Sequence, residues 1–178
     1  MNPIDSVREI LFHKVWQNQF LPIDFRHFSL NFVNNYYKLN VHLSNEDPTV
    51  SADCSFCTTN YVALGAEREK IDHFFGKCNV TKRFATEYFN QFLENVNFNF
   101  SIDWLLLGAP STLALDLIFI INIEIMFLNY FMYNCRFKKS KPRIIDFLNF
   151  MSWNRKVMRK NHSYNVKFAK LKFPFDRG

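Results

Sequence analysis

The chain has 178 residues and a mass of 21.3 kDa, which fits one domain with an appendage and excludes a large two-domain catalytic architecture. Its 4 glycines lie far apart, so the sequence has no glycine-rich loop of the kind that holds nucleotide phosphates. The formal net charge is +6, but residues 1–135 hold 9 Lys and Arg against 14 Asp and Glu, whereas residues 136–178 hold 13 against 2. The basic C-terminal part indicates an anionic partner.

The N-terminal half of the sequence predicts an α+β fold. Residues 6–19 begin with the Ser-x-x-Glu spacing of a capping box, which predicts a helix. Residues 27–43 alternate apolar with polar side chains around a central Asn-Asn pair, and this pattern predicts a β-hairpin with one buried face. Residues 81–95 carry an aromatic side chain at every fourth position, which predicts a helix with a buried aromatic stripe.

Three cysteines and one histidine have the spacing of a metal site. Cys54 and Cys57 form a Cys-x-x-Cys pair, and His73 and Cys78 follow. Three thiolates and one imidazole complete a tetrahedral shell for Zn²⁺, and a two-residue gap lets both thiolates of the pair bind from one tight turn. The alternative is a buried or redox-active thiol pair with an unrelated histidine. The sequence therefore predicts a small zinc-stabilised domain over residues 1–103.

The order of these ligands resembles the zinc-binding BIR module of apoptosis inhibitors. An extended segment at residues 50–53 precedes the Cys-x-x-Cys pair, and the predicted aromatic helix follows Cys78. The interval between His73 and Cys78 is shorter than in that family, and no Trp lies between Cys57 and His73. The resemblance implies metal ligation at these four residues, without the family's peptide-binding role.

Residues 104–135 form the most apolar part of the sequence. A short apolar run ends at Pro110, and a longer one continues from Leu113 to Cys135. Nineteen helical residues, 117–135, would span about 28 Å at ~1.5 Å each, close to the hydrocarbon core of ~30 Å. The sequence predicts one long helix here, which either embeds in a membrane or forms the core of a soluble protein.

Four polar residues in this predicted helix are candidates for helix pairing: Asp116, Asn122, Glu124 and Asn129. Asp116 falls in the first turn, where the positive end of the helix dipole favours a carboxylate. The two asparagines share one face and Glu124 lies on the opposite face, which predicts a helix with protein neighbours on both sides. In a membrane, Glu124 would pair with a second helix or with a copy of itself in a homo-oligomer.

The charges around the apolar run give conflicting indications of topology. The basic residues after Cys135 would be cytoplasmic by the positive-inside rule, which would place the zinc domain across the membrane. The first residues, however, lack the features of a secretory signal, and thiolate ligands favour a reducing compartment. A hairpin hinged at Pro110 would resolve the conflict, because both ends would then remain in the cytoplasm or nucleoplasm.

Residues 136–178 form a basic tail with a predicted amphipathic helix. The spacing of Ile144, Phe147, Leu148, Met151 and Met158 is helical. With Phe150 and Trp153, this helix has the composition of an interfacial membrane anchor, and nucleic acid is the competing partner. The residues predicted to bind the anionic partner are Arg136, Lys138, Lys139, Lys141, Arg143, Arg155, Lys156, Arg159 and Lys160.

The Cys-x-x-Cys pair, the stretch from Asp72 to Cys78, the aromatic helix and the late apolar segment with its basic tail together resemble a conserved late protein family of baculoviruses and nudiviruses. That family is needed for nucleocapsid envelopment. The resemblance implies a membrane-associated, non-enzymatic protein of virion assembly, with viral capsid or envelope proteins as partners. It would act in the host nucleus, at the nuclear membrane or in the cytoplasm, and could be part of the virion. The alternative is a soluble, zinc-stabilised, BIR-like module that contacts an acidic protein or nucleic acid.

Overall fold

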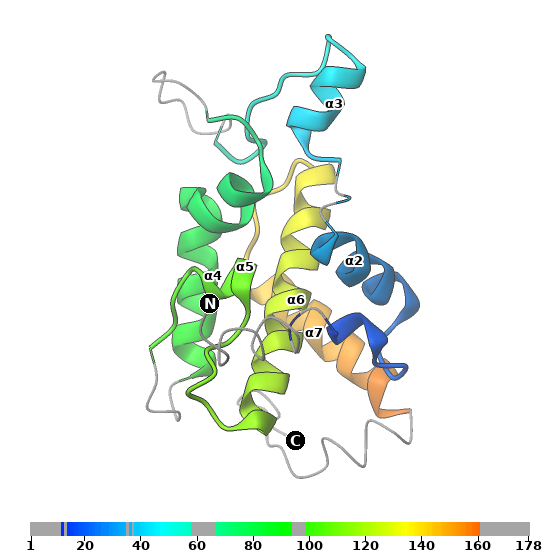
Figure 1. Ribbon diagram of the computed structural model, residues 1–178, viewed down its shortest axis with the longest axis vertical. Helices are drawn as coiled ribbons and strands as arrows, with labels where there is room; N and C mark the ends of the chain where they lie inside the picture. Colours follow the sequence, from blue (N-terminus) through cyan, green and yellow to red (C-terminus); the bar gives the residue numbers. More distant parts are fainter. Residues whose placement is uncertain are drawn as a thin grey trace.

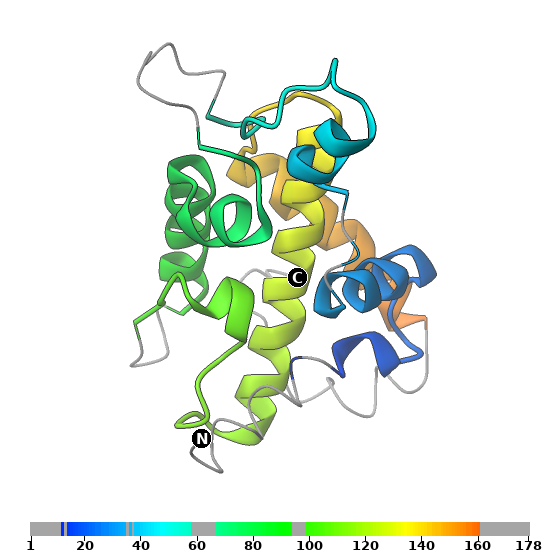
Figure 2. The same ribbon diagram turned by 45° about the horizontal axis from the view of Figure 1, so that its top comes forward.

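Helix α6 (Leu115–Phe137) runs through the middle of the molecule, and the other helices surround it (Figures 1 and 2). The computed structural model describes residue 12 and residues 14–34, 36, 38–57, 67–93 and 99–160. The remaining helices are η1 (Val15–Gln17), α2 (Ile23–Val33), α3 (Asn40–Glu46), η2 (Asp72–Lys77), α4 (Asn79–Phe92), α5 (Trp104–Leu107) and α7 (Ile144–Arg159). In Figure 1, α4 and α5 lie to one side of α6, α2 lies to the other, and α7 crosses behind it.

The predicted β-hairpin over residues 27–43 is wrong, and with it the α+β fold. Helix α2 covers the first part of this segment and helix α3 begins at its end, and the only β pairing among the described residues is an isolated antiparallel bridge between Asp53 and Arg68. The alternation spans few residues, and Phe25, Phe28 and Phe32 also follow a helical spacing. All three are buried, and Phe25 stacks on Phe127 of α6 with 3.8 Å between ring centroids. Packing of these aromatic side chains against α6 therefore stabilises helix α2 rather than the predicted strand.

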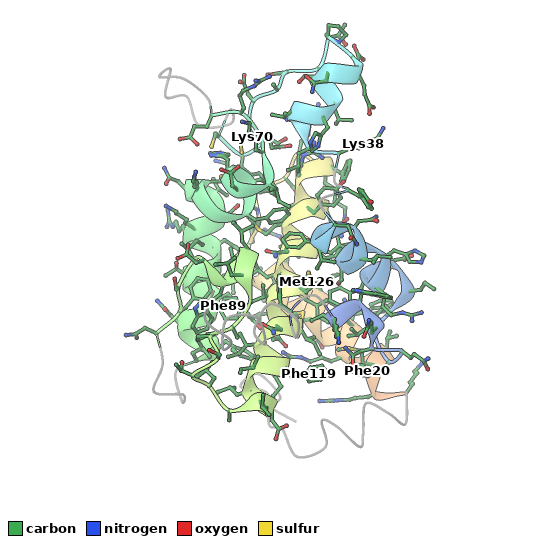
Figure 3. All side chains as sticks on the ribbon, viewed as in Figure 1. Phe20, Lys38, Lys70, Phe89, Phe119 and Met126 are labelled. Carbon is green, nitrogen blue, oxygen red and sulfur yellow. The ribbon has the colours of Figure 1, made fainter. Side chains whose placement is uncertain are left out.

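The aromatic helix predicted for residues 81–95 is confirmed. Helix α4 runs from Asn79 to Phe92, and its stripe of Phe84, Tyr88 and Phe92 is buried. Phe89, which is labelled in Figure 3, is also buried. Half of the helix predicted for residues 6–19 falls outside the described residues, and within the described half lies the short helix η1.

Helices α5 and α6 lie antiparallel on either side of Pro110, and whether this pair enters a membrane, as the predicted hairpin would, stays a prediction. The side-chain amide of Asn129 donates to the carbonyl oxygen of Leu105 over 2.8 Å, and the backbone N–H of Ala109 donates to Oδ1 of Asn122 over 2.7 Å. Later residues of one segment thus meet earlier residues of the other, as in an antiparallel pair. Gly108 makes the close approach possible: it has φ +80°, and a Cβ atom there would lie 2.9 Å from Oδ1 of Asn122.

Glu124 lies on the opposite face of α6 and is paired within the chain. The hydroxyl of Tyr88 donates to its Oε2 over 2.6 Å, and the guanidinium of Arg155 in α7 donates to its Oε1 over 2.9 Å. All three side chains are buried, and burial beside the carboxylate raises the pKa of Tyr88. The prediction that α6 has protein neighbours on both sides is confirmed.

Helix α6 is long and apolar enough to span a membrane, and among the described residues it is the one helix of which this holds. In the structure, 67% of its most apolar window is buried by the rest of the chain. Asp116, by contrast, is exposed in the first turn and pairs with no other helix in the described hydrogen bonds.

One hydrophobic core joins the three segments into which the sequence was divided, 1–103, 104–135 and 136–178. It includes Phe25 and Phe89 of the first segment, Met126 of the second and Phe147 of the third. Figure 3 shows Met126 near the centre of the molecule, between Phe89 on one side and Phe20 on the other. The described part of the basic tail, residues 136–160, therefore belongs to the folded body.

Replacing Glu124 by Leu removes the carboxylate that Arg155 binds in the core, and we expect it to lower the free energy of unfolding by about 3–5 kcal/mol. Replacing both residues by Leu should restore most of this loss, because no buried charge then lacks its counterion. Chemical denaturation measures both values, with Glu87→Leu on the exposed side of α4 as the control. Equal losses in the single and double variants would contradict an ion pair as the cause.

Candidate metal centre

The four predicted ligands converge at one point. The ligand atoms of Cys54, Cys57, His73 and Cys78 all lie within 4.8 Å of one another. Sγ of Cys78 is 3.9 Å from Sγ of Cys54 and 3.8 Å from Sγ of Cys57, and Sγ of Cys57 is 3.4 Å from Nε2 of His73. Cys57 is half-buried and the other three are buried. The cluster could hold a metal ion.

These distances match the edges of a tetrahedral metal site. With metal–sulfur bonds of about 2.3 Å and metal–nitrogen bonds of about 2.0–2.1 Å, a tetrahedron has sulfur–sulfur edges of about 3.8 Å and sulfur–nitrogen edges of about 3.5 Å. The three separations given above agree with these values to within about 0.1 Å, and all four ligand atoms lie within 4.8 Å of one another. The four side chains could therefore hold one ion between them.

Backbone hydrogen bonds around an antiparallel bridge place the Cys-x-x-Cys turn. The N–H of Cys54 donates to the carbonyl of Glu67 over 3.0 Å, and the N–H of Cys57 donates to the carbonyl of Cys54 over 3.0 Å. The first bond brings two distant segments together, and the second closes the tight turn that points both sulfurs the same way. The two-residue gap between Cys54 and Cys57 thus forms the tight turn that the sequence predicts.

The other two ligands lie at the two ends of a π-helical turn. His73 and Cys78 are five residues apart in and after η2, and the N–H of Cys78 donates to the carbonyl of His73 over 2.6 Å. An i→i+5 bond of this kind is rare, and it occurs frequently at functional sites. It brings these two ligands to the same side of the turn, which explains how so short an interval suits a metal site.

The environment of Cys78 stabilises a thiolate. Cys78 precedes the first residue of α4, and its sulfur receives hydrogen bonds from the thiol of Cys54 and from the backbone N–H groups of Val80 and Thr81. These donors, the thiol of Cys54 first among them, lower the pKa of Cys78 to about 5. The same hydrogen bond raises the pKa of Cys54, while burial raises the pKa of Cys57 to about 11.

Glu67 orients the histidine and was missed by the sequence analysis. Its Oε2 lies 2.6 Å from Nδ1 of His73, so this carboxylate accepts a hydrogen bond from Nδ1–H and leaves Nε2 free to bind a metal. A carboxylate behind a ligating histidine is a common second layer of metal sites. A Glu six residues before the histidine is the signal that was available in the sequence.

A buried ion pair attaches the metal loop to α6. Glu69 is fully buried and binds the guanidinium of Arg136, which also donates to Oδ1 of Asn40 over 2.7 Å. Oε2 of Glu69 accepts the backbone N–H of Ser55, between the first two ligands, over 2.7 Å. The last turn of α6 and the Cys-x-x-Cys turn are thereby held in one network.

This network corrects one prediction about anion binding, and the Glu124 pair corrects another. Arg136 and Arg155 were both predicted to contact an anionic partner, but both are buried and bind carboxylates of the same chain. Arg143 is exposed and forms a bidentate pair with Asp146. The other predicted cations are exposed: Lys138, Lys139, Lys141, Lys156, Arg159 and Lys160. Residues 161–178 of the predicted tail lie outside the described part of the chain.

No protein-family model, curated protein or solved structure matches this chain. Functional inference therefore depends on the geometry of the site itself.

Replacing Cys57 by Ala removes one of the four ligands, and we expect loss of the metal and a destabilisation of about 4 kcal/mol or more. Cys135→Ala is the matched control, because Cys135 is also a buried, reduced cysteine but lies outside the cluster. Elemental analysis of the purified variants and thermal unfolding give the two readouts. Equal metal content in both variants would show that Cys57 is not a ligand.

Replacing Glu67 by Gln should weaken metal binding by about 10–100-fold while the fold is retained, because His73 loses the carboxylate that orients its ring. Competition with a chromogenic chelator measures the affinity. Glu46→Gln, which also loses an exposed carboxylate bound to a basic group, is the control. An affinity unchanged in both variants would remove Glu67 from the site.

Proposed function

We propose that this protein is a non-enzymatic binding module whose fold is stabilised by a structural zinc ion and whose exposed basic C-terminal residues contact an anionic partner. The observation that carries the proposal is the convergence of three sulfurs and one imidazole nitrogen at tetrahedral spacing. Soft thiolates and an imidazole in this geometry favour Zn²⁺ over Mg²⁺ or Ca²⁺, which prefer oxygen ligands.

The closed ligand set supports a structural role for the metal. Catalytic zinc keeps one position open for water or substrate, whereas four protein ligands fill a tetrahedral shell. The network of Glu69 and Arg136 couples this shell to the core helix, so metal binding stabilises more than the loop itself. Zinc would then act as a clip that holds residues 54–78 against the helical body.

The same atoms also suggest a cysteine nucleophile, with Cys57, His73 and Glu67 in the order of a catalytic triad. Two observations favour the metal. Activated cysteines have a lowered pKa, but burial raises the pKa of Cys57 to about 11. In addition, the sulfur of Cys78 lies 3.8 Å from that of Cys57, a separation expected of two thiolates on one metal ion.

A virion-assembly protein with a membrane-embedded helix is the second candidate. One support is the length and apolar character of α6. The other is the stretch from Asp72 to Cys78, which is part of the baculovirus resemblance and contains two of the four candidate metal ligands. The intrachain pairing of Glu124 with Arg155 favours the first proposal, because insertion of α6 into lipid would break this pair. Extraction of expressing cells with alkaline carbonate separates the two, since an embedded helix resists release and a core helix does not.

We expect the purified chain to contain one zinc ion and to lose thermal stability when a strong chelator removes it. Zinc affinity should rise with pH, because the metal must displace the proton of Cys57, whose pKa is raised. Elemental analysis and circular dichroism, each with and without chelator, measure both effects. The proposal would be refuted if the purified protein contained no metal and if neither zinc nor chelator changed its unfolding temperature.

A further inference from the structure

We propose that the exposed stripe of α7 formed by Ile145, Asn149, Trp153, Lys156 and Lys160, here called the α7 stripe, binds the surface of an anionic lipid membrane. This inference rests on the proposed function and names the anionic partner. It places the contact on the outside of the folded body, so α6 remains in the core.

The orientation of α7 decides which of its residues reach solvent. Phe147, Met151 and Met158 are buried against the core, and Arg155 turns inward to Glu124. Residues of the α7 stripe recur at intervals of three and four and lie on the other side of the helix, where all five are exposed. The helix is thus packed by its apolar face and presents a second, mixed face outward.

Trp153 is the most unusual residue of this face. Its side chain is 64% exposed, and Ile145 two turns earlier is 58% exposed. Tryptophan is enriched at membrane–water interfaces, because its ring is apolar while its N–H can bond to headgroups or water. Phe150, which the sequence also suggested as an anchor, packs instead with its ring centroid 5.9 Å from that of Phe127 in the core.

The charged residues that follow Phe147 along α7 are all basic. From Phe147 to Lys160 the sequence contains no Asp or Glu, and Lys156, Arg159 and Lys160 are exposed. The one carboxylate of α7, Asp146, lies near the other end of the helix in a pair with Arg143. A cluster of cations beside an exposed tryptophan complements a surface that is anionic and has an apolar interior.

A membrane fits this face better than a nucleic acid. Single-stranded nucleic acids bind to series of aromatic rings on which successive bases stack. The α7 stripe offers one aromatic ring, and its polar members are two flexible lysines and one asparagine. An extended lipid surface needs no matching series of rings, because binding there scales with the apolar area that is buried and with the attraction of cations to anionic headgroups.

The experiment is co-sedimentation of the full chain with vesicles of pure phosphatidylcholine or of equal parts phosphatidylcholine and phosphatidylserine. We expect binding to the anionic vesicles, loss of binding at high salt, and a blue shift of tryptophan fluorescence on binding. Lys156→Gln with Lys160→Gln should weaken binding by about 25-fold, since each lysine contributes about fivefold. Trp153→Ala should abolish the blue shift and weaken binding as well.

Matched controls alter the same chemistry elsewhere on the surface. Lys82→Gln with Arg83→Gln removes two exposed cations from α4, and Tyr36→Ala removes another exposed aromatic ring. Both should bind anionic vesicles like the unaltered protein. Equal weakening by the α4 and α7 charge variants would overturn the proposal, because binding would then reflect overall charge. Binding of single-stranded DNA through the α7 stripe, without binding to anionic vesicles, would overturn it as well.

Zinc content and circular dichroism of each variant keep this test separate from that of the metal centre. A Trp153→Ala protein that keeps its zinc and its helices but binds vesicles unchanged would refute the membrane surface alone. A zinc-free wild-type chain that still binds anionic vesicles through Trp153 would refute the metal proposal alone. If the α7 stripe binds the membrane surface, alkaline carbonate should release the vesicle-bound protein. Retention of the protein on the vesicles would indicate insertion of α6 instead and would overturn the proposal.

Discussion

The burial of α6 is the constraint on which the rest of the structure depends. A long, largely apolar helix must be covered by the rest of the chain, and a polar side chain buried with it is costly unless it is hydrogen-bonded. Oδ1 of Asn122 accepts the N–H of Ala109, Nδ2 of Asn129 donates to the carbonyl of Leu105, and Glu124 binds Tyr88 and Arg155. The second polar atom of each asparagine is buried without a partner among the described residues. These bonds also determine where α4, α5 and α7 lie, because each partner belongs to a different element.

The metal centre is attached to this same helix through charge. Arg136, in the last turn of α6, binds Glu69, and Glu69 accepts the backbone N–H of Ser55 between the first two ligands. A buried ion pair contributes little net stability by itself, but breaking one is costly. Its structural effect is to hold the Cys-x-x-Cys turn in one place relative to the core. A zinc ion bound there would stabilise a loop that the core has already positioned, and this explains why four candidate ligands from two distant segments lie within 4.8 Å of one another.

The placement of the charges changes the picture of how the protein meets a partner. Two of the cations that the sequence assigns to the surface, Arg136 and Arg155, neutralise buried carboxylates instead. The exposed positive charge is therefore smaller and more local than the composition indicates, and part of it surrounds Trp153 on α7. In sequence, the apolar helix α6 and the basic helix α7 with Trp153 both have features of membrane-binding helices. In the structure, α6 is largely buried, and α7 has an exposed face.

The sequence by itself determined that Cys54, Cys57, His73 and Cys78 form a cluster that could hold a metal ion, and it determined the aromatic helix after them and the long apolar helix. These features depend on local spacing: ligand intervals, a four-residue aromatic repeat, and polar residues on two faces of one helix. The tertiary structure alone decided that residues 23–33 are helical, that Glu67 supports His73, and that Arg136 and Arg155 are internal. Each of these outcomes depends on a partner far along the chain, as Phe25 depends on Phe127, or Arg136 on Glu69. A short alternation or a single charge fits several environments equally well, and the free energy of packing and of pairing buried charges, which local spacing does not contain, selects among them.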